Sequence, residues 1–287
     1  MKRGSFVKAL ICLLAVSCSV REPDNMEGIA IGGKVYFATL ESYAQPDTKA
    51  YVDENIKIRW DADDRISLFE HLTKNLQYRF TGNTGDVDGT FQEVPSSSFS
   101  TGGDLDYLCA VYPYLTSTKI RNDDLLYLTL PEKQTYRKGS FGPGANTMVS
   151  VTEEEPLEFK NTGGYLVLKF YGNGVSVSSI RLEGKNDEKL SGQATMKPEI
   201  GVLPKITMAE TAGTSITLTC DEPTELGAEK ENATVFWMVV PPTTFSKGFK
   251  LTVTGPDGKV FVKETDKSLS IVRNTLVRVS PVEVKLN

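Results

Sequence analysis

Carboxylates beside glycine are the residues of this chain whose pattern most resembles a metal site. Asp86 and Asp88 precede Gly89, as in part of a calcium-binding loop. Placing Gly89 at the loop's sixth position puts Thr84 first and Pro95 twelfth, where carboxylate ligands are needed. We therefore interpret this segment as a turn and predict no metal there.

A second acidic group and the only histidine are the next candidates. Asp61, Asp63 and Asp64 could hold a cation together with water, but beside Arg65 they are more simply an acidic turn that opens a strand. His71 excludes sites built from several histidines and leaves a single possible base for a serine hydrolase. It lies between two predicted strands, so we interpret it as a solvated loop residue.

The remaining motifs provide no catalytic constellation. The glycines of 139–144 (GSFGPG) lack the strand-to-helix frame of a nucleophile elbow or a phosphate-binding loop. No nucleophile is paired with a base, so we predict that the protein is not an enzyme and uses no cofactor. The net charge of −5, from 32 basic and 37 acidic residues, argues against nucleic acid as a partner.

The first residues predict export and lipid attachment. Residues 1–17 combine a basic start with a short apolar stretch, which is too short to span a bilayer and is typical of a signal peptide. Ala15-Val16-Ser17-Cys18 resembles a bacterial lipobox, although Ala15 stands where leucine is usual. We expect Cys18 to be acylated as the mature N-terminus. The alternative is an ordinary secretory signal with an incidental cysteine.

Removal of the signal peptide changes what can hold the protein to a membrane. Three basic residues and no acidic ones are lost with residues 1–17, so the net charge moves from −5 to −8. Anionic lipid would repel such a chain, which leaves the acyl group as the anchor. Residues 18–27 are polar and are predicted to be a flexible tether. Cys109 and Cys220 could form a disulfide, but their apolar contexts favour buried free thiols.

Short segments rich in β-branched and aromatic residues recur about every ten residues along the chain. This spacing is typical of antiparallel sandwiches, so we predict an all-β fold. The expected strands include Lys34–Thr39, Asn55–Trp60, Ser215–Cys220, which alternates apolar and polar residues, and Val277–Lys285. Gly255–Gly258 predicts the turn of a hairpin, and Thr224–Glu231 could form one or two helical turns. An acidic, proline-terminated run at Thr152–Pro156 is interpreted as a solvated connection, and it suggests a boundary near residues 152–162 between two domains, at 28–157 and 158–287.

Several blocks, read in order, resemble the Bacteroidales fimbrillin (Mfa-like) family, whose members are subunits of type V pili. Each block is weak alone, and their order over most of the chain makes the resemblance specific. The blocks are Lys34–Thr39, Thr48-Lys49-Ala50, Ile58–Trp60 with Asp64–Phe69, Tyr107–Tyr114 (YLCAVYPY), Leu130–Gln134 (LPEKQ), Leu157–Asn161 (LEFKN) and Val239–Pro242.

The resemblance implies two tandem transthyretin-like antiparallel β-sandwich domains in an outer membrane lipoprotein that reaches the cell surface. It also implies a structural role in a fimbrium that contributes to adhesion. Lipoprotein processing enzymes and a trypsin-like surface protease would mature the chain, and other fimbrillin subunits would join it by donor-strand exchange. The protease would cut at Lys49–Ala50 and release a strand near Ile29–Leu40. Lysine replaces the commoner arginine there, so a protease strict for arginine would not cut.

Two alternatives stay open at this point. The tail Val277–Leu286 could be the donor strand, or it could complete its own sandwich. The chain could also act as a monomeric surface glycan-binding lipoprotein, because tandem β-sandwiches serve that purpose and Tyr112, Tyr114 and Tyr136 could stack on sugars. Burial of these tyrosines in the core would count against that alternative.

Overall fold

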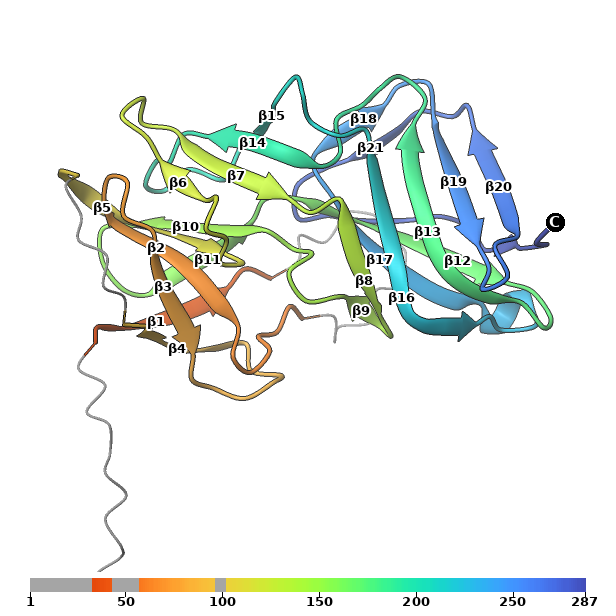
Figure 1. Cartoon of the computed structure of the whole chain (residues 1–287), viewed down its shortest axis with the longest axis horizontal. Coiled ribbons are helices and arrows are strands. Elements are labelled where there is room, and N and C mark those ends of the chain that lie inside the picture. The colour runs from red at the N-terminus through yellow and green to blue at the C-terminus, as the bar shows by residue number, and fades with distance from the viewer. Residues whose placement is uncertain (1–32, 43–56, 96–101) are drawn as a thin grey trace, which may run out of the picture. The chain divides into compact units, whose positions relative to one another are not determined.

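The computed structural model describes residues 33–42, 57–95 and 102–287, and strands dominate all three ranges (Figure 1). The all-β prediction is confirmed, since the helical structure in these ranges is a single 3₁₀ turn, η1 (Lys230–Asn232). No helix within the described ranges is long and apolar enough to cross a membrane. The predicted acylation site Cys18 and the predicted processing sites Lys49 and Ala50 lie outside the described residues.

Seven strands between Val35 and Asn161 close into a barrel. β1 completes it, because β1 pairs antiparallel with β4 on one side and parallel with β11 on the other. In order around the barrel they are β1 (Val35–Leu40), β11 (Leu157–Asn161), β10 (Met148–Thr152), β5 (Asp104–Tyr112), β2 (Arg65–His71), β3 (Leu76–Phe80) and β4 (Asp88–Glu93). The predicted tandem transthyretin-like sandwiches stay a prediction.

The remaining strands form four smaller sheets. The largest contains β20 (Val260–Thr265), β19 (Phe249–Thr254), β13 (Ser176–Gly184), β16 (Ser215–Glu225), β8 (Lys133–Arg137) and β9 (Ser140–Phe141). A central sheet contains β17 (Thr234–Val240), β12 (Gly164–Tyr171), β22 (Leu276–Arg278) and β23 (Val282–Glu283). The others are β15 (Thr207–Met208), β14 (Gly192–Met196), β7 (Leu126–Leu130) and β6 (Lys119–Ile120), and the pair β18 (Thr243–Phe245) and β21 (Leu269–Ile271).

Long apolar runs in the sequence become strands that are buried on both faces. In β12, Tyr165 and Val167 pack into the barrel cluster, whereas Leu166, Leu168 and Phe170 pack into a second cluster. Successive side chains of a strand point to opposite faces, so a run without polar residues must be covered on both. β17 divides its residues between the same two clusters. The central sheet therefore joins the two hydrophobic cores.

Strand pairing crosses the predicted domain boundary in both directions. From the first half of the chain, β7 pairs with β14 and β8 pairs with β16. β11 follows the acidic connection, yet it pairs with β1 and β10 in the barrel. The described residues belong to one compact unit. The division at residues 157/158 stays a prediction that strand pairing does not mark.

Two expected segments differ in the structure. Residues 57–60 form no strand, because the main chain of Trp60 pairs with Asp86 and Gly85, which lie in a turn. Residues 224–231 do not form the one or two helical turns expected of them, because β16 continues to Glu225 and the 3₁₀ turn begins only at Lys230. The acidic run is exposed over residues 153–156 and lies outside the strands, as expected, and β11 begins directly after it at Leu157.

Candidate functional site

The first described strand occupies a channel between β4 and β11, which we call the β1 channel. β4 pairs with Val35–Thr39, and β11 pairs with Ala38–Leu40, so each edge of the strand is satisfied over part of its length (Figure 1). The sequence favours this strand because aromatic and β-branched residues dominate VYFATL. Without β1, the backbone groups of β4 and β11 that it satisfies would be exposed.

The apolar contribution of β1 to the core is small. Ala38 is its one fully buried side chain, and the partly buried Tyr36 and Leu40 pack beside it. The opposite face carries Val35 and Phe37, which are 46% and 38% exposed. The strand is therefore held largely by backbone pairing and by polar contacts near its two ends.

At its start, β1 is fixed to a carboxylate of β2. Lys34 Nζ lies 2.8 Å from Glu70 Oε1, and the hydroxyl of Tyr36 donates to the same oxygen. Burial alone would raise the pKa of Glu70, but these hydrogen bonds outweigh burial and lower that pKa. In the middle of the strand, the Phe37 amide donates to Glu155 Oε2 at 3.0 Å.

At its end, β1 meets a buried polar cluster, which we call the Glu41 clamp: Glu41, Asn161, Arg273 and Asn274. Arg273 donates to both carboxylate oxygens of Glu41, at 2.6 and 2.9 Å. The backbone amide of Asn161 donates to Glu41 Oε2 at 2.9 Å, and Asn274 Nδ2 donates to the carbonyl of Ser42 at 2.8 Å. Sequence reasoning missed this cluster, because Glu41 and Arg273 are 232 residues apart and each looks like an ordinary surface charge.

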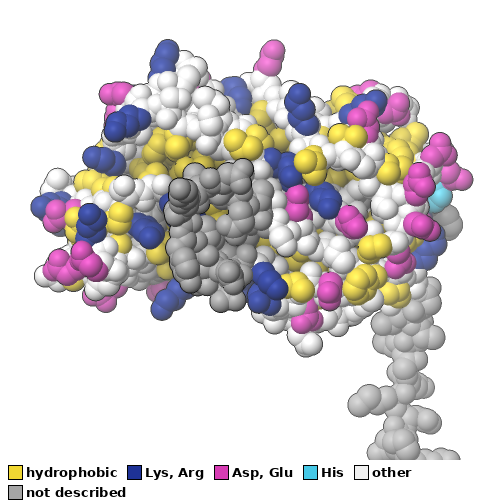
Figure 2. All heavy atoms as spheres, turned by 180° about the vertical axis from the view of Figure 1, so that it is seen from behind, with side chains coloured by type: hydrophobic (Ala, Val, Ile, Leu, Met, Phe, Trp, Pro, Cys, Tyr) yellow, Lys and Arg dark blue, Asp and Glu magenta, His cyan; other side chains and the backbone are white. Residues whose placement is uncertain are grey.

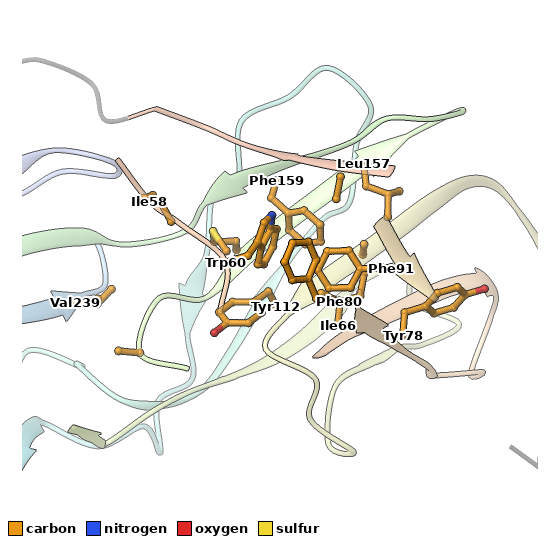
Figure 3. Packing of buried hydrophobic residues seen from close by; sticks show 14 of the residues in the cluster. Ile58, Trp60, Ile66, Tyr78, Phe80, Phe91, Tyr112, Leu157, Phe159 and Val239 are labelled. Carbon is orange, nitrogen blue, oxygen red and sulfur yellow. The ribbon is translucent and has the colours of Figure 1, made fainter. Parts of the chain in front are cut away.

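Behind β1, the barrel core is dense with aromatic side chains. Trp60 is 1% exposed, and its ring lies within 5.8 Å, centroid to centroid, of its aromatic neighbours (Figure 3). These neighbours are Phe80, Phe91, Tyr112 and Phe159. Two of them, Phe91 and Phe159, belong to the strands that flank β1. Loss of β1 would therefore open an apolar groove on a core that is already packed.

The C-terminal tail, the candidate donor strand, pairs within its own chain. β22 and β23 run parallel to β12, and Val284 is 1% exposed. Residues 279–281 separate the two short strands, and Pro281 among them offers no amide for a ladder. The tail thus completes the second core, which was the alternative to a free donor.

A cavity of about 460 Å³ lies beside Trp60 and is lined in part by the carboxylate of Asp64. Burial raises the pKa of Asp64 to about 6, although Asp61 N and the Tyr112 hydroxyl donate to its carboxylate at 2.8 and 3.0 Å. Arg137 is paired in bidentate fashion with Asp61, at 2.6 and 2.7 Å. These polar groups satisfy one another and present no nucleophile beside a base.

The other residues singled out from the sequence have structural surroundings. His71 lies at the end of β2, not in a loop, and its Nδ1 is 2.6 Å from Asp104 Oδ1. Asp86 accepts a hydrogen bond from the Asn83 amide in a turn, as predicted. Cys109 is a buried free thiol, and Cys220 is a half-buried one. Among the described residues, no group of three or more His, Cys, Asp or Glu could hold a metal ion.

Two of the three tyrosines proposed as sugar platforms pack on a hydrophobic core. Tyr112 is 7% exposed and hydrogen-bonded to Asp64. Tyr136 lies 4.9 Å from Phe236, centroid to centroid, at the edge of the second core. Tyr114 is half-buried. On the face shown in Figure 2, basic and acidic side chains are interspersed and form no single basic patch.

Comparison with known proteins gives weak structural similarities. No protein-family model matches the chain, and no curated protein matches its sequence. Two crystal structures, each of a "putative cell adhesion protein", resemble it. The one from Bacteroides ovatus has a TM-score of 0.48 at 14% identity and covers 86% of this chain and 91% of its own. The one from Bacteroides uniformis has a TM-score of 0.45 at 14% identity, with 88% and 94% covered.

A third similarity is to a fimbrial protein from Bacteroides ovatus, with a TM-score of 0.35 and 14% identity. It covers 88% of this chain and 50% of that protein. With TM-scores below 0.5, none of these similarities assigns the chain to a fold family or a function.

Proposed function

We propose that this protein is a non-enzymatic subunit of a cell-surface fimbrium and acts as an acceptor in donor-strand exchange. The observation that carries the proposal is the position of β1. It closes the barrel, it precedes every other described strand, and one cut between residues 42 and 57 would separate it from all of them. The predicted bond Lys49–Ala50 lies in that interval.

The physical basis of exchange is β-augmentation. A channel with unpaired backbone groups on two edges and an apolar floor is a strong template for an incoming strand. β1 adds only one fully buried side chain, so a replacement strand needs to match few apolar contacts. The order of sequence blocks that resembles fimbrillins gives the same role, with acylation at Cys18 and delivery to the outer membrane.

The test is to determine where surface chains begin. We expect N-terminal sequencing to find chains that begin at acylated Cys18 in membranes and at Ala50 in fibres. Lys49→Gln should block the second form and the fibres, whereas Lys57→Gln, which lies just beyond the interval, should block neither. Fibres whose chains keep residues 18–49 would contradict the proposal.

Cys18→Ala should release the chain from membranes, and unchanged membrane partitioning would contradict the lipid anchor.

A further inference from the structure

We infer that the Glu41 clamp recognises a carboxylate. The β1 channel therefore selects strands that carry an acidic side chain at the position of Glu41, one residue after the residue that pairs with Phe159. This inference rests on the proposed function, in which β1 is exchanged. It concerns the chemistry of the incoming strand, which strand exchange alone does not specify.

The site has the donor set of a carboxylate receptor. Glu41 receives a bidentate pair from Arg273 and a third hydrogen bond from the Asn161 amide. The planar guanidinium matches a carboxylate in geometry, which makes such pairs selective. The Glu41 and Arg273 side chains are only 15% and 16% exposed, so water screens the pair weakly.

The receptor side of the clamp does not depend on β1. Arg273 Nη1 also donates to the carbonyl of Asn161 at 3.0 Å. Asn161 Nδ2 donates to Asn274 Oδ1 at 2.8 Å, and Asn146 Nδ2 donates to Asn161 Oδ1 at 2.7 Å. The three asparagines are at most 2% exposed. None of these contacts involves β1, so departure of β1 would remove the counter-charge of Arg273 without removing the groups that hold its guanidinium.

An uncompensated cation of this kind determines which strand fits. Removing one partner of a buried ion pair is strongly unfavourable, because the other charge remains desolvated. A strand with a neutral residue at the Glu41 position would leave Arg273 in that state.

The clamp also fixes register. Leu40 pairs with Phe159, and the Glu41 amide donates to the Phe159 carbonyl at 2.9 Å, which places the carboxylate at Arg273. A slip of one residue would exchange the inward and outward faces of the strand and move the acid away. The clamp therefore distinguishes sequence position as well as charge.

The experiment uses the full chain with a specific protease site in place of residues 46–52. After cleavage, fluorescent peptides that copy residues 33–42 compete with the resident β1, and their affinities are measured by anisotropy. We expect the E41Q peptide to bind at least about tenfold more weakly than the unchanged peptide. A K34Q peptide should lose less than about threefold, because the Lys34 side chain is 63% exposed.

Two further variants isolate position and partner. A peptide with E41S and S42E keeps the net charge but shifts the acid, and it should bind as weakly as the E41Q peptide. Protein carrying R273Q should bind the unchanged and E41Q peptides about equally, which closes a double-mutant cycle. The peptide series on unmodified protein decides the question even if R273Q fails to fold.

The outcomes separate the two proposals. Equal binding of the unchanged and E41Q peptides would overturn carboxylate recognition, and so would equal binding of the unchanged and shifted-acid peptides. Either result would leave the proposal of strand exchange unaffected. If no peptide, including the unchanged one, enters the cleaved protein, strand exchange fails and the inference fails with it.

Discussion

The first described strand and the C-terminal tail each complete part of this molecule, and they do so with different interactions. β1 closes the barrel, and the C-terminal tail, through β22 and β23, completes the central sheet. Both run parallel to a neighbour, β11 and β12 respectively. The tail buries Leu276 and Val284 and packs four further apolar side chains on the second core. β1 buries Ala38 and packs the partly buried Tyr36 and Leu40 on the barrel core, and it is held otherwise by backbone pairing and polar contacts.

This difference indicates which of the two segments, β1 or the C-terminal tail, can be replaced by another strand. Apolar burial stabilises a segment without regard to direction, and losing it exposes the surface of both partners. Hydrogen bonds and ion pairs contribute less net free energy, and a replacement strand with matching groups recovers them. The tail is therefore expected to behave as part of the folded unit, and β1 as a replaceable element. Substitutions in the two segments test that contrast.

Val284→Asp should have the largest effect. It places an unpaired carboxylate in the second core at a side chain that is 1% exposed, and it should lower the free energy of unfolding by about 3–5 kcal/mol. Urea denaturation followed by circular dichroism measures this loss. Lys285→Asp puts the same group on the neighbouring exposed residue and should cost about 1 kcal/mol or less. Similar losses of unfolding free energy for the two variants would remove the distinction between the C-terminal tail and β1.

Ala38→Leu should weaken the closing strand of the barrel. The added atoms overpack the one fully buried position of β1, at a cost of about 1–3 kcal/mol. Because the strain falls on a replaceable strand, hydrogen exchange should show loss of protection in β1 before the rest of the barrel. Phe37→Thr changes the outward face and should stay within about 0.5 kcal/mol. A global loss that spares β1 protection would contradict the comparison.

Asp64→Asn should change how stability depends on pH. The folded-state pKa is raised from 3.8 to about 6, so the folded protein binds more protons than the unfolded chain between about pH 4 and pH 6. The contribution of Asp64 to stability is therefore lost as pH rises through that window. Thermal unfolding from pH 4 to 8 should give a flatter profile for the variant and a higher Tm above pH 6. Parallel profiles for the two proteins would refute this assignment.

Lys34→Gln should have the smallest effect. Its ion pair with Glu70 lies at the surface, where salt screens it. The free energy of unfolding should therefore fall by about 1 kcal/mol or less, and by less still in high salt. Denaturation at two salt concentrations checks both points. A salt-independent loss of several kcal/mol would place the main anchor of β1 at its start and not at the Glu41 clamp.

Much of the local structure could be predicted from residue patterns. The alternation in Ser215–Cys220 predicts a strand that the structure extends to Glu225, and Gly255–Gly258 predicts the turn between β19 and β20. The last predicted strand, Val277–Lys285, is broken at Ser280 and Pro281 because proline cannot continue the ladder. The β1 strand was predicted at nearly its observed bounds, Val35–Leu40.

The candidate site was only partly predictable. Its strand is local, but its clamp joins Glu41 to Asn161 and Arg273, and nothing in a single sequence pairs residues so far apart. The placement of β11 was also missed, because the acidic run and proline before it resemble a linker, whereas Leu157 and Phe159 are buried in the barrel. Neighbouring strands decide such cases, since apolar alternation over five residues is too short a signal by itself.

The sequence alone determined that this chain is built of strands, because alternation, β-branched residues and turn chemistry act over a few neighbouring residues. Tertiary structure decided which strands meet, that β1 and the C-terminal tail each run parallel to one neighbour, and that Glu41 and Ser42 meet Arg273, Asn161 and Asn274 after β1 ends. Those outcomes depend on contacts between distant segments, and they form only when the whole set of sheets has packed.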